Sequence, residues 1–198
     1  MSFRDIVGHE QVITILRSAL VKKRVGMSYL FYGPSGVGKA FVAKQFAKSL
    51  NCERQNDDCC DSCSACLKSQ RIEYPDLHWL DLQDDSENIK IEQIRRMQEE
   101  INLRPFEGKA KVFIINNCQR LTEEAANCLL KVVEEPPSDS VIILIAAHAR
   151  AVLPTIASRC QKIRFANLRR HHVEGILEKN YKVGLMQSRY LAYYSDGK

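Results

Sequence analysis

Residues 33–40 read Gly33-Pro34-Ser35-Gly36-Val37-Gly38-Lys39-Ala40, and this stretch decides the fold class. A short apolar run at residues 28–32 precedes it, and a run with helical spacing at residues 39–50 follows it. Glycines and a lysine at this spacing, between a strand and a helix, are typical of a loop that binds phosphate through backbone N–H groups and the helix N-terminus. The sequence therefore predicts a nucleotide-binding loop made by Gly33, Gly36, Gly38, Lys39 and Ala40.

The eighth position of this loop departs from the usual pattern. A Ser or Thr is expected there, because its hydroxyl group ligates Mg²⁺. Ala40 has no oxygen to offer. Phosphates can still fit the loop, but a magnesium ion would lose a ligand, so we expect ATP or ADP to be bound weakly or not at all.

A second element of a hydrolysing site is also missing from the sequence. Such a site needs carboxylates at the end of a neighbouring strand, to hold Mg²⁺ and to activate water. The apolar run at residues 112–115 is followed instead by Asn116 and Asn117. We therefore expect that intrinsic ATP hydrolysis has been lost, although the sequence alone leaves enzymatic activity uncertain. In the alternative interpretation, Asp81 or Asp84 supplies the missing carboxylate.

Strands and helices alternate outward from the loop. Apolar runs predict strands at residues 28–32, 77–82, 112–115, 141–145 and 162–165, and helical spacing predicts helices at 39–50, 91–103 and from Thr122 to about Glu135. This alternation predicts an α/β fold with a parallel sheet that is covered by helices on both faces. Beyond Phe165 only helices are expected, at 169–181 and 185–194, so we predict two domains at residues 1–166 and 167–198. The helical pattern is still unfinished at the last residue, and we expect the chain to be part of a longer protein.

Cysteines cluster in one segment of the chain. Five of the eight lie between Cys52 and Cys66, and Cys60, Cys63 and Cys66 follow one another at two-residue spacers. Four thiolates close a tetrahedral zinc site, which is then structural. We predict Cys52, Cys60, Cys63 and Cys66 as the ligands. Cys59 competes with Cys60, and unliganded thiols or an iron–sulfur cluster are the alternatives.

Composition limits the partners only loosely. The formal net charge of +5 permits a nucleic-acid partner without requiring one. No apolar run approaches the roughly 20 residues that span a membrane, so we expect no membrane partner. The first residues lack the apolar core of a signal peptide, and a cytoplasmic location is expected.

The segment from Pro154 to Cys160 resembles the clamp-loader subunits of the AAA+ family. The similarity extends to residues 3–10, 75–78, 122–127, 129–131, 134–136 and 153–155. It implies an AAA+ P-loop core with a five-stranded parallel sheet, an inserted zinc module at about residues 52–66, a small all-α lid, and a C-terminal collar that this chain lacks. In the Ser158-Arg159-Cys160 triplet, the resemblance implies that Arg159 is an arginine finger that acts in trans, on a neighbouring subunit's ATP.

Within that family, a failed ATP site with an intact finger resembles the delta-prime branch of DNA polymerase III subunits. The resemblance implies other clamp-loader subunits (gamma/tau and delta) as partners, and the sliding clamp and primer-template DNA through the complex. A catalytically active gamma/tau-type ATPase is the second hypothesis. A nucleic-acid binding module built on the cysteine cluster is the third, and it is disfavoured because the segment is short and lacks interleaved aromatic residues.

Overall fold

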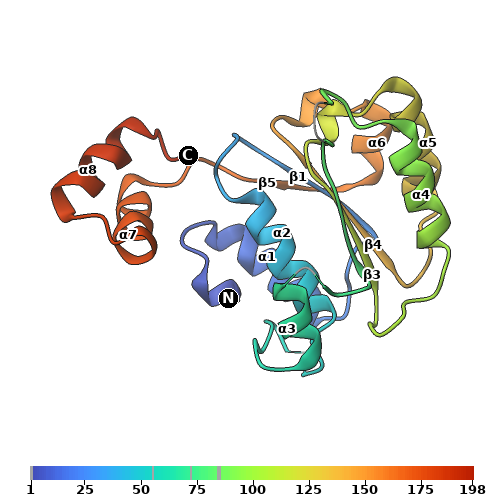
Figure 1. Ribbon diagram of the computed structural model, residues 1–198, viewed down its shortest axis with the longest axis horizontal. Helices are drawn as coiled ribbons and strands as arrows, with labels where there is room; N and C mark the ends of the chain where they lie inside the picture. Colours follow the sequence, from blue (N-terminus) through green and yellow to red (C-terminus); the bar gives the residue numbers. More distant parts are fainter. Residues whose placement is uncertain (1, 55, 72, 84–85) are drawn as a thin grey trace.

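The computed structural model describes residues 2–54, 56–71, 73–83 and 86–198, and its centre is a five-stranded parallel sheet (Figure 1). The spatial order of the strands is β2-β3-β4-β1-β5, and every neighbouring pair is parallel. The strands are β1 (Ser28–Tyr32), β2 (Leu77–Leu80), β3 (Lys111–Ile115), β4 (Ser140–Ala146) and β5 (Gln161–Arg164). The predicted α/β fold with a five-stranded parallel sheet is confirmed.

Burial along the strands follows from their place in the sheet. Every residue of β3 and β4 is buried, as expected for strands with neighbours on both sides and helices on both faces. The edge strand β2 is half-buried along its whole length, and in the other edge strand, β5, only Ile163 is buried. Continuous apolar runs therefore marked the central strands most clearly.

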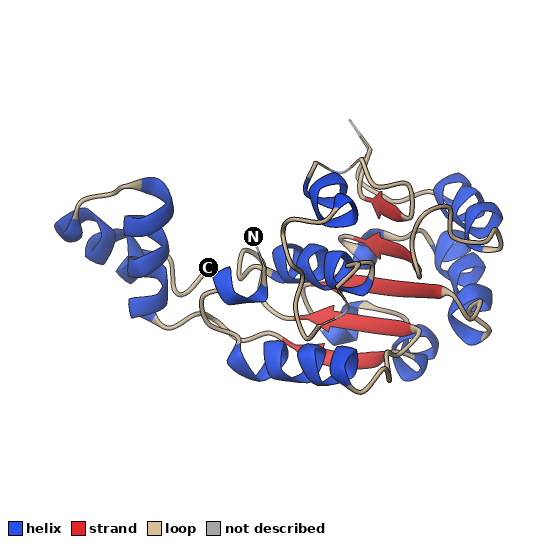
Figure 2. Ribbon diagram, turned by 90° about the horizontal axis from the view of Figure 1, so that it is seen from below, coloured by secondary structure: helices blue, strands red, loops and turns tan. Residues whose placement is uncertain are grey.

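Helices form a layer on each face of the sheet (Figures 1 and 2). The helices are α1 (Glu10–Val21), α2 (Lys39–Leu50), α3 (Ser64–Gln70), α4 (Ile91–Ile101), α5 (Glu123–Glu134), α6 (Pro154–Arg159), α7 (Arg170–Tyr181) and α8 (Leu185–Tyr194), with short 3₁₀ turns η1 (Phe3–Asp5), η2 (Cys118–Arg120) and η3 (Ala149–Ala151). In the described part of the chain, none of these helices has the length and apolar character needed to cross a bilayer.

Two apolar cores lie on opposite faces of the sheet. Side chains of α1 and α2, such as Leu16 and Phe46, pack with Ile114 of β3 on one face. Side chains of α4, α5 and α6 pack with Phe113 of β3 on the other face. Successive residues of a strand point to opposite faces, so β3 contributes alternately to the two cores. This double cover holds the carboxyl ends of the strands in a fixed arrangement.

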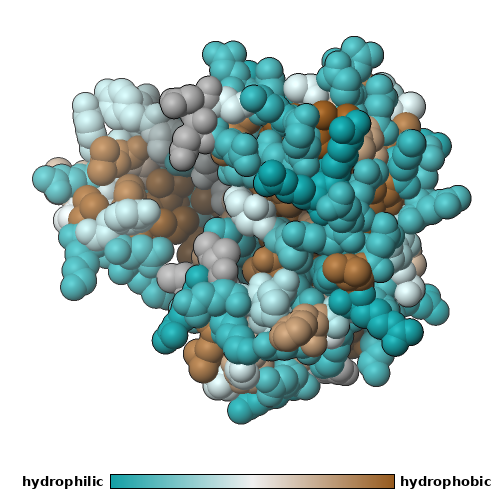
Figure 3. Space-filling view, turned by 45° about the vertical axis from the view of Figure 1, so that its right-hand side comes forward, coloured by the Kyte–Doolittle hydropathy of each residue, from teal (hydrophilic) through white to brown (hydrophobic). Residues whose placement is uncertain are grey.

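The chain after β5 contains only α7 and α8, which pack mainly against each other at the left of Figure 1. They leave several large side chains exposed, and brown surface is visible on the left-hand lobe of Figure 3. The backbone N–H of Leu168 donates to the carbonyl of Gly197 at 3.0 Å, which ties the end of α8 back to the start of the segment.

The element boundaries differ from the prediction at a few places. β2 ends at Leu80 and α4 at Ile101, each two residues earlier than expected. The Thr122 hydroxyl caps α5 by accepting the Ala125 N–H at 3.2 Å, as predicted. Three helices were not predicted from the sequence: α1, α3 and α6. The last two are six or seven residues long, too short to show a clear period.

Candidate functional site

The loop between β1 and α2 follows the carboxyl end of a central strand. Gly33 lies against Phe165, the residue after β5, and a Cβ atom at Gly33 would be 2.2 Å from the Phe165 carbonyl oxygen. Gly38 is the N-cap of α2 and has a φ of 96°, which residues with a side chain rarely adopt. Glycine is therefore required at both positions, and the loop opens α2 with its N–H groups free to face an anion.

Lys39 is held inside this loop. Its ammonium group donates to the carbonyl oxygens of Gly33 at 2.7 Å and Pro34 at 2.6 Å, and the residue is buried. Burial lowers the pKa of Lys39 below its ordinary value. The ammonium group has three hydrogens, so one is left to donate to a phosphate bound at the loop while both carbonyl contacts remain.

A cavity of about 430 Å³ beside the loop is lined by the positions where the sequence lacks the hydroxyl and the carboxylates of a hydrolysing site. Ala40, Asn116 and Asn117 all line it. Ala146 and Ala147, at the end of β4, line the same cavity with methyl groups. They come together because the carboxyl ends of parallel strands meet at one edge of a sheet. Among the described residues, no carboxylate lines this cavity.

Asp81, the first alternative carboxylate, is engaged by the two asparagines. Its side chain accepts from the Asn116 amide at 2.7 Å and from the Asn117 amide at 3.0 Å, and also from the backbone N–H of Leu82 at 2.9 Å. Burial alone would raise the pKa of Asp81, but these donors outweigh it and hold the pKa below its usual value. Asp81 does not line the cavity beside the loop, and Asp84, the second alternative, lies outside the described residues.

A second cavity, of about 440 Å³, lies between the loop and α7. His9 and Phe41 line one side of it, and Ile176 and Tyr181 of α7 line the other. The His9 Nε2 lies 2.7 Å from the carbonyl oxygen of Val37, so Nε2 carries the hydrogen and donates it. These residues were not predicted as part of the site, because no local pattern shows that the N-terminal segment and α7 face the same loop.

Arg159 lies at the C-terminal end of α6, apart from both cavities. One guanidinium nitrogen, Nη2, pairs with the Glu134 carboxylate at 2.8 Å, and the other, Nη1, donates to the Thr155 carbonyl at 3.0 Å. The Arg159 side chain is 41% exposed. The guanidinium group is thus partly exposed and held by two contacts within its own chain.

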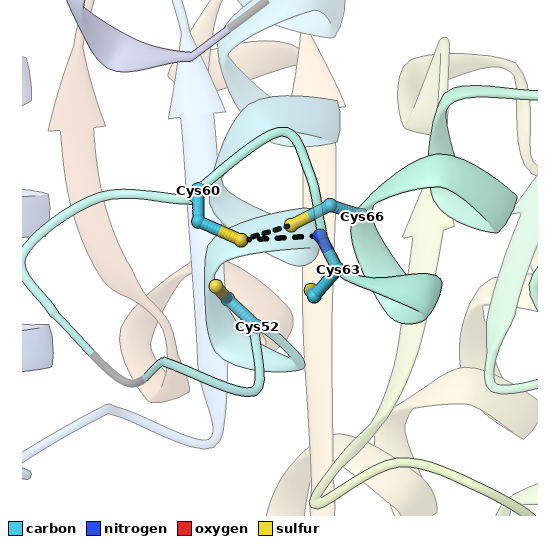
Figure 4. A group of neighbouring side chains, drawn as sticks. All are labelled: Cys52, Cys60, Cys63 and Cys66. Atoms are coloured by element: carbon cyan, nitrogen blue, oxygen red, sulfur yellow. Dashed lines mark hydrogen bonds between the residues drawn. The ribbon is translucent and has the colours of Figure 1, made fainter.

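The four cysteines predicted as zinc ligands lie together (Figure 4). Their sulfur atoms are all within 4.8 Å of one another, and the Sγ atoms of Cys60 and Cys66 are 4.0 Å apart. Zn–S bonds of about 2.3 Å in a tetrahedron place the sulfurs roughly 3.8 Å apart, so the group fits a zinc ion. Cys52 follows α2, and Cys63 and Cys66 lie at the start of α3.

Cys59 packs against this group, but its sulfur atom is not one of the four that meet. Its thiol faces Asp61 at 3.8 Å, and burial raises its pKa to about 11. Hydrogen bonds from Ser62 and from the backbone of Cys63 lower the pKa of Cys60 to about 5. The position of the sulfur atoms therefore favours Cys60 over Cys59 as the fourth ligand.

Comparisons with known proteins agree on one family. The family described as "DNA polymerase III, delta subunit" matches residues 8–169. Bacillus subtilis DNA polymerase III subunit delta' is 37% identical over 164 residues, which cover 83% of this chain and 49% of that protein. Bacillus subtilis subunit tau is 34% identical over 178 residues, which cover 89% of this chain and 31% of that protein. The chain thus spans about half or less of the length of these relatives.

Solved structures share the fold. A DNA polymerase III gamma subunit-related protein from Thermotoga maritima superposes with a TM-score of 0.62 at 23% identity, covering 92% of this chain and 57% of that one. The Thermotoga maritima RuvB Holliday junction branch migration motor superposes with a TM-score of 0.63 at 14% identity, covering 96% of this chain and 57% of its own. The chain has the AAA+ α/β fold.

Proposed function

The chain belongs to the DNA polymerase III delta-subunit family, and on that premise we propose that it is a clamp-loader subunit of the delta-prime type in DNA replication. In this proposal it can hold nucleotide phosphates but does not hydrolyse ATP, and it completes the ATP site of a neighbouring subunit. Its partners would be the gamma/tau and delta subunits and, through the complex, the sliding clamp and primer-template DNA.

The observation that carries this proposal is the chemistry of the cavity beside the phosphate loop. Ala40 offers no hydroxyl group for Mg²⁺, and Asn116 and Asn117 offer amides where carboxylates are needed. Asp81, which follows β2, is already bound to both amides. A water molecule in this cavity would have no general base to activate it.

Arg159 supplies the second part of the proposal. It is exposed at the end of α6, and its position in the Ser-Arg-Cys triplet supports a role as an arginine finger in trans. Such an arginine stabilises charge on the transferred phosphoryl group and raises the rate by roughly 10³–10⁵.

The remaining parts of the chain would have supporting roles. We assign residues 1–166 to an AAA+ core and residues 167–198 to part of a helical lid that closes the cavity between the loop and α7. Zinc held by Cys52, Cys60, Cys63 and Cys66 would cross-link the insert at residues 52–66, without an open coordination position for chemistry.

A gamma/tau-type ATPase is the second candidate function, because the chain is 34% identical to a tau subunit over 89% of its own residues. Hydrolysis by the purified chain separates the two candidates. Mg²⁺-dependent turnover of ATP by this protein alone would support the ATPase and contradict a subunit without a general base.

The test of the finger is the substitution Arg159→Ala in the full-length protein, assembled with its partner subunits. We expect ATP hydrolysis at the neighbouring site to fall by about 10³-fold or more, with an unchanged thermal melting curve of the variant. Arg95→Ala, which removes an exposed arginine on α4, is the matched control and should leave the rate unchanged. Normal hydrolysis in the Arg159→Ala complex would refute the proposed role.

A further inference from the structure

From the contacts at the ends of α5 and α6, we infer that Glu134 is a positioning residue for Arg159. It fixes the guanidinium group in the orientation in which a neighbouring subunit's phosphate meets it. This inference rests on the proposed function, because it assigns a part to Glu134 only if Arg159 acts in trans.

The two residues occupy equivalent places on adjacent helices. Glu134 is the last residue of α5 and Arg159 is the last residue of α6, and the two helices pack side by side at the right of Figure 1. The Glu134 Oε1 atom lies 2.8 Å from Nη2 of Arg159. Glu134 therefore reaches the guanidinium from a different helix, whose position is set by the apolar core.

A second contact fixes the orientation of the guanidinium group. Nη1 of Arg159 donates to the carbonyl oxygen of Thr155, one helical turn earlier, at 3.0 Å. One bond alone would let the guanidinium plane turn about it. Hydrogen bonds from two different nitrogens fix both the position and the plane of the guanidinium group. An exposed arginine without such contacts would sample many rotamers.

The hold leaves the guanidinium able to bind phosphate. An arginine side chain has five N–H donors, and the contacts with Glu134 and Thr155 use one hydrogen on each of two nitrogens. Three donors remain, and the side chain is still 41% exposed. A phosphoryl oxygen from another subunit can therefore be bound without breaking either contact.

The opposite reading is that Glu134 competes with phosphate and keeps the finger inactive. The two readings predict changes of opposite sign when the carboxylate is removed. A positioning residue lowers kcat when it is lost, whereas a competing carboxylate raises it. The free donors and the exposure of the guanidinium favour positioning.

The experiment compares Glu134→Gln with Glu135→Gln in full-length protein assembled with its partner subunits. Glu135 is the neighbouring exposed acid, and the described residues give it no ion pair, so its substitution removes the same charge without the contact. We expect Glu134→Gln to lower kcat for ATP by about two- to five-fold, the effect of losing one exposed ion pair, with KM for ATP and the melting temperature unchanged. Glu135→Gln should behave as the wild type, and Glu134→Asp should recover part of the loss.

Wild-type or higher kcat in the Glu134→Gln complex would overturn the inference. So would an equal loss in Glu135→Gln, since the effect would then come from charge alone. In an Arg159→Ala background, Glu134→Gln should lower the residual rate no further, and an additional loss there would show that Glu134 acts by another route. If Arg159→Ala itself has no effect on ATP hydrolysis, the proposed function is wrong. If Arg159→Ala lowers the rate but Glu134→Gln does not, only the inference about Glu134 is wrong.

Discussion

The side chain of Asp76 is fully buried just before β2, and its carboxylate accepts three backbone hydrogen bonds. The donors are the N–H groups of Phe106, Glu107 and Gly108, at 2.7, 2.8 and 2.7 Å. Burial alone would raise the pKa of Asp76, but these donors and the nearby Lys111 outweigh it and keep the pKa below its usual value. One carboxylate thus shapes the turn that leads into β3, whose far end forms part of the candidate site.

We predict that Asp76→Asn lowers the free energy of unfolding at pH 7 by about 1–3 kcal/mol, because an amide cannot accept all three bonds as a charged group does. The lowered pKa means that the carboxylate stabilises the fold above the ordinary Asp pKa of about 3.9, and that this contribution is lost as the pH falls through the lowered value. Urea unfolding at several pH values measures both effects.

Asp139→Asn, at an exposed aspartate before β4, is the control and should change stability little. Wild-type and Asp76→Asn proteins should converge in stability in acid. A constant difference down to the acid limit would contradict the role of the charge.

The cysteine-containing insert is anchored to the core at the scale of elements. Lys48 of α2 is buried and pairs with Asp61 of the insert, at 2.5 Å between Nζ and Oδ1. Asp58 accepts the backbone N–H of Phe3 at 3.0 Å, which ties the insert to η1 as well. A metal that orders the insert therefore also supports the helix that follows the phosphate loop.

We predict that Cys63→Ser abolishes zinc binding and unfolds the segment around residues 52–66, because three thiolates cannot close the tetrahedral site. Metal analysis of the purified protein gives the zinc content, and hydrogen exchange gives the extent of local unfolding. Cys59→Ser is the matched control, since it changes a neighbouring buried cysteine outside the group. Full zinc content in Cys63→Ser, or its loss in Cys59→Ser, would refute the ligand assignment.

On the scale of the whole molecule, two cavities flank the phosphate loop. One lies under the strand ends and the other between the loop and α7, so a nucleotide would contact both the core and the helices after β5. Among the described residues that line the two cavities, the only carboxylate is Asp5, at the rim of the second one.

We therefore predict that binding of ATP or ADP is insensitive to Mg²⁺. Titration calorimetry with the full-length protein, in MgCl₂ and again in EDTA, should give the same Kd. Lys39→Ala should weaken binding in both buffers, because its ammonium group is directed into the loop. Clearly tighter binding in MgCl₂ would mean that the protein holds the ion after all.

The fold and part of the candidate site were predictable because their signals are local. Apolar runs and helical spacing marked all five strands and most of the longer helices, and the loop spacing marked Gly33–Ala40. The shortest helices were missed, since six or seven residues carry too little periodicity. Asp76 was noticed only as part of a resemblance, because its partners lie about thirty residues away along the chain.

By itself, the sequence determined which chemical groups exist near the loop: no hydroxyl at position 40, no acid at 116 and 117, and enough thiols for one metal. Only the tertiary structure decided which of them meet, such as Asp81 with both asparagines and Glu134 with Arg159. The physical reason is that spacing along a chain fixes contacts within one or two helical turns. Contacts between distant residues depend on strand order and helix packing, which the whole core sets together.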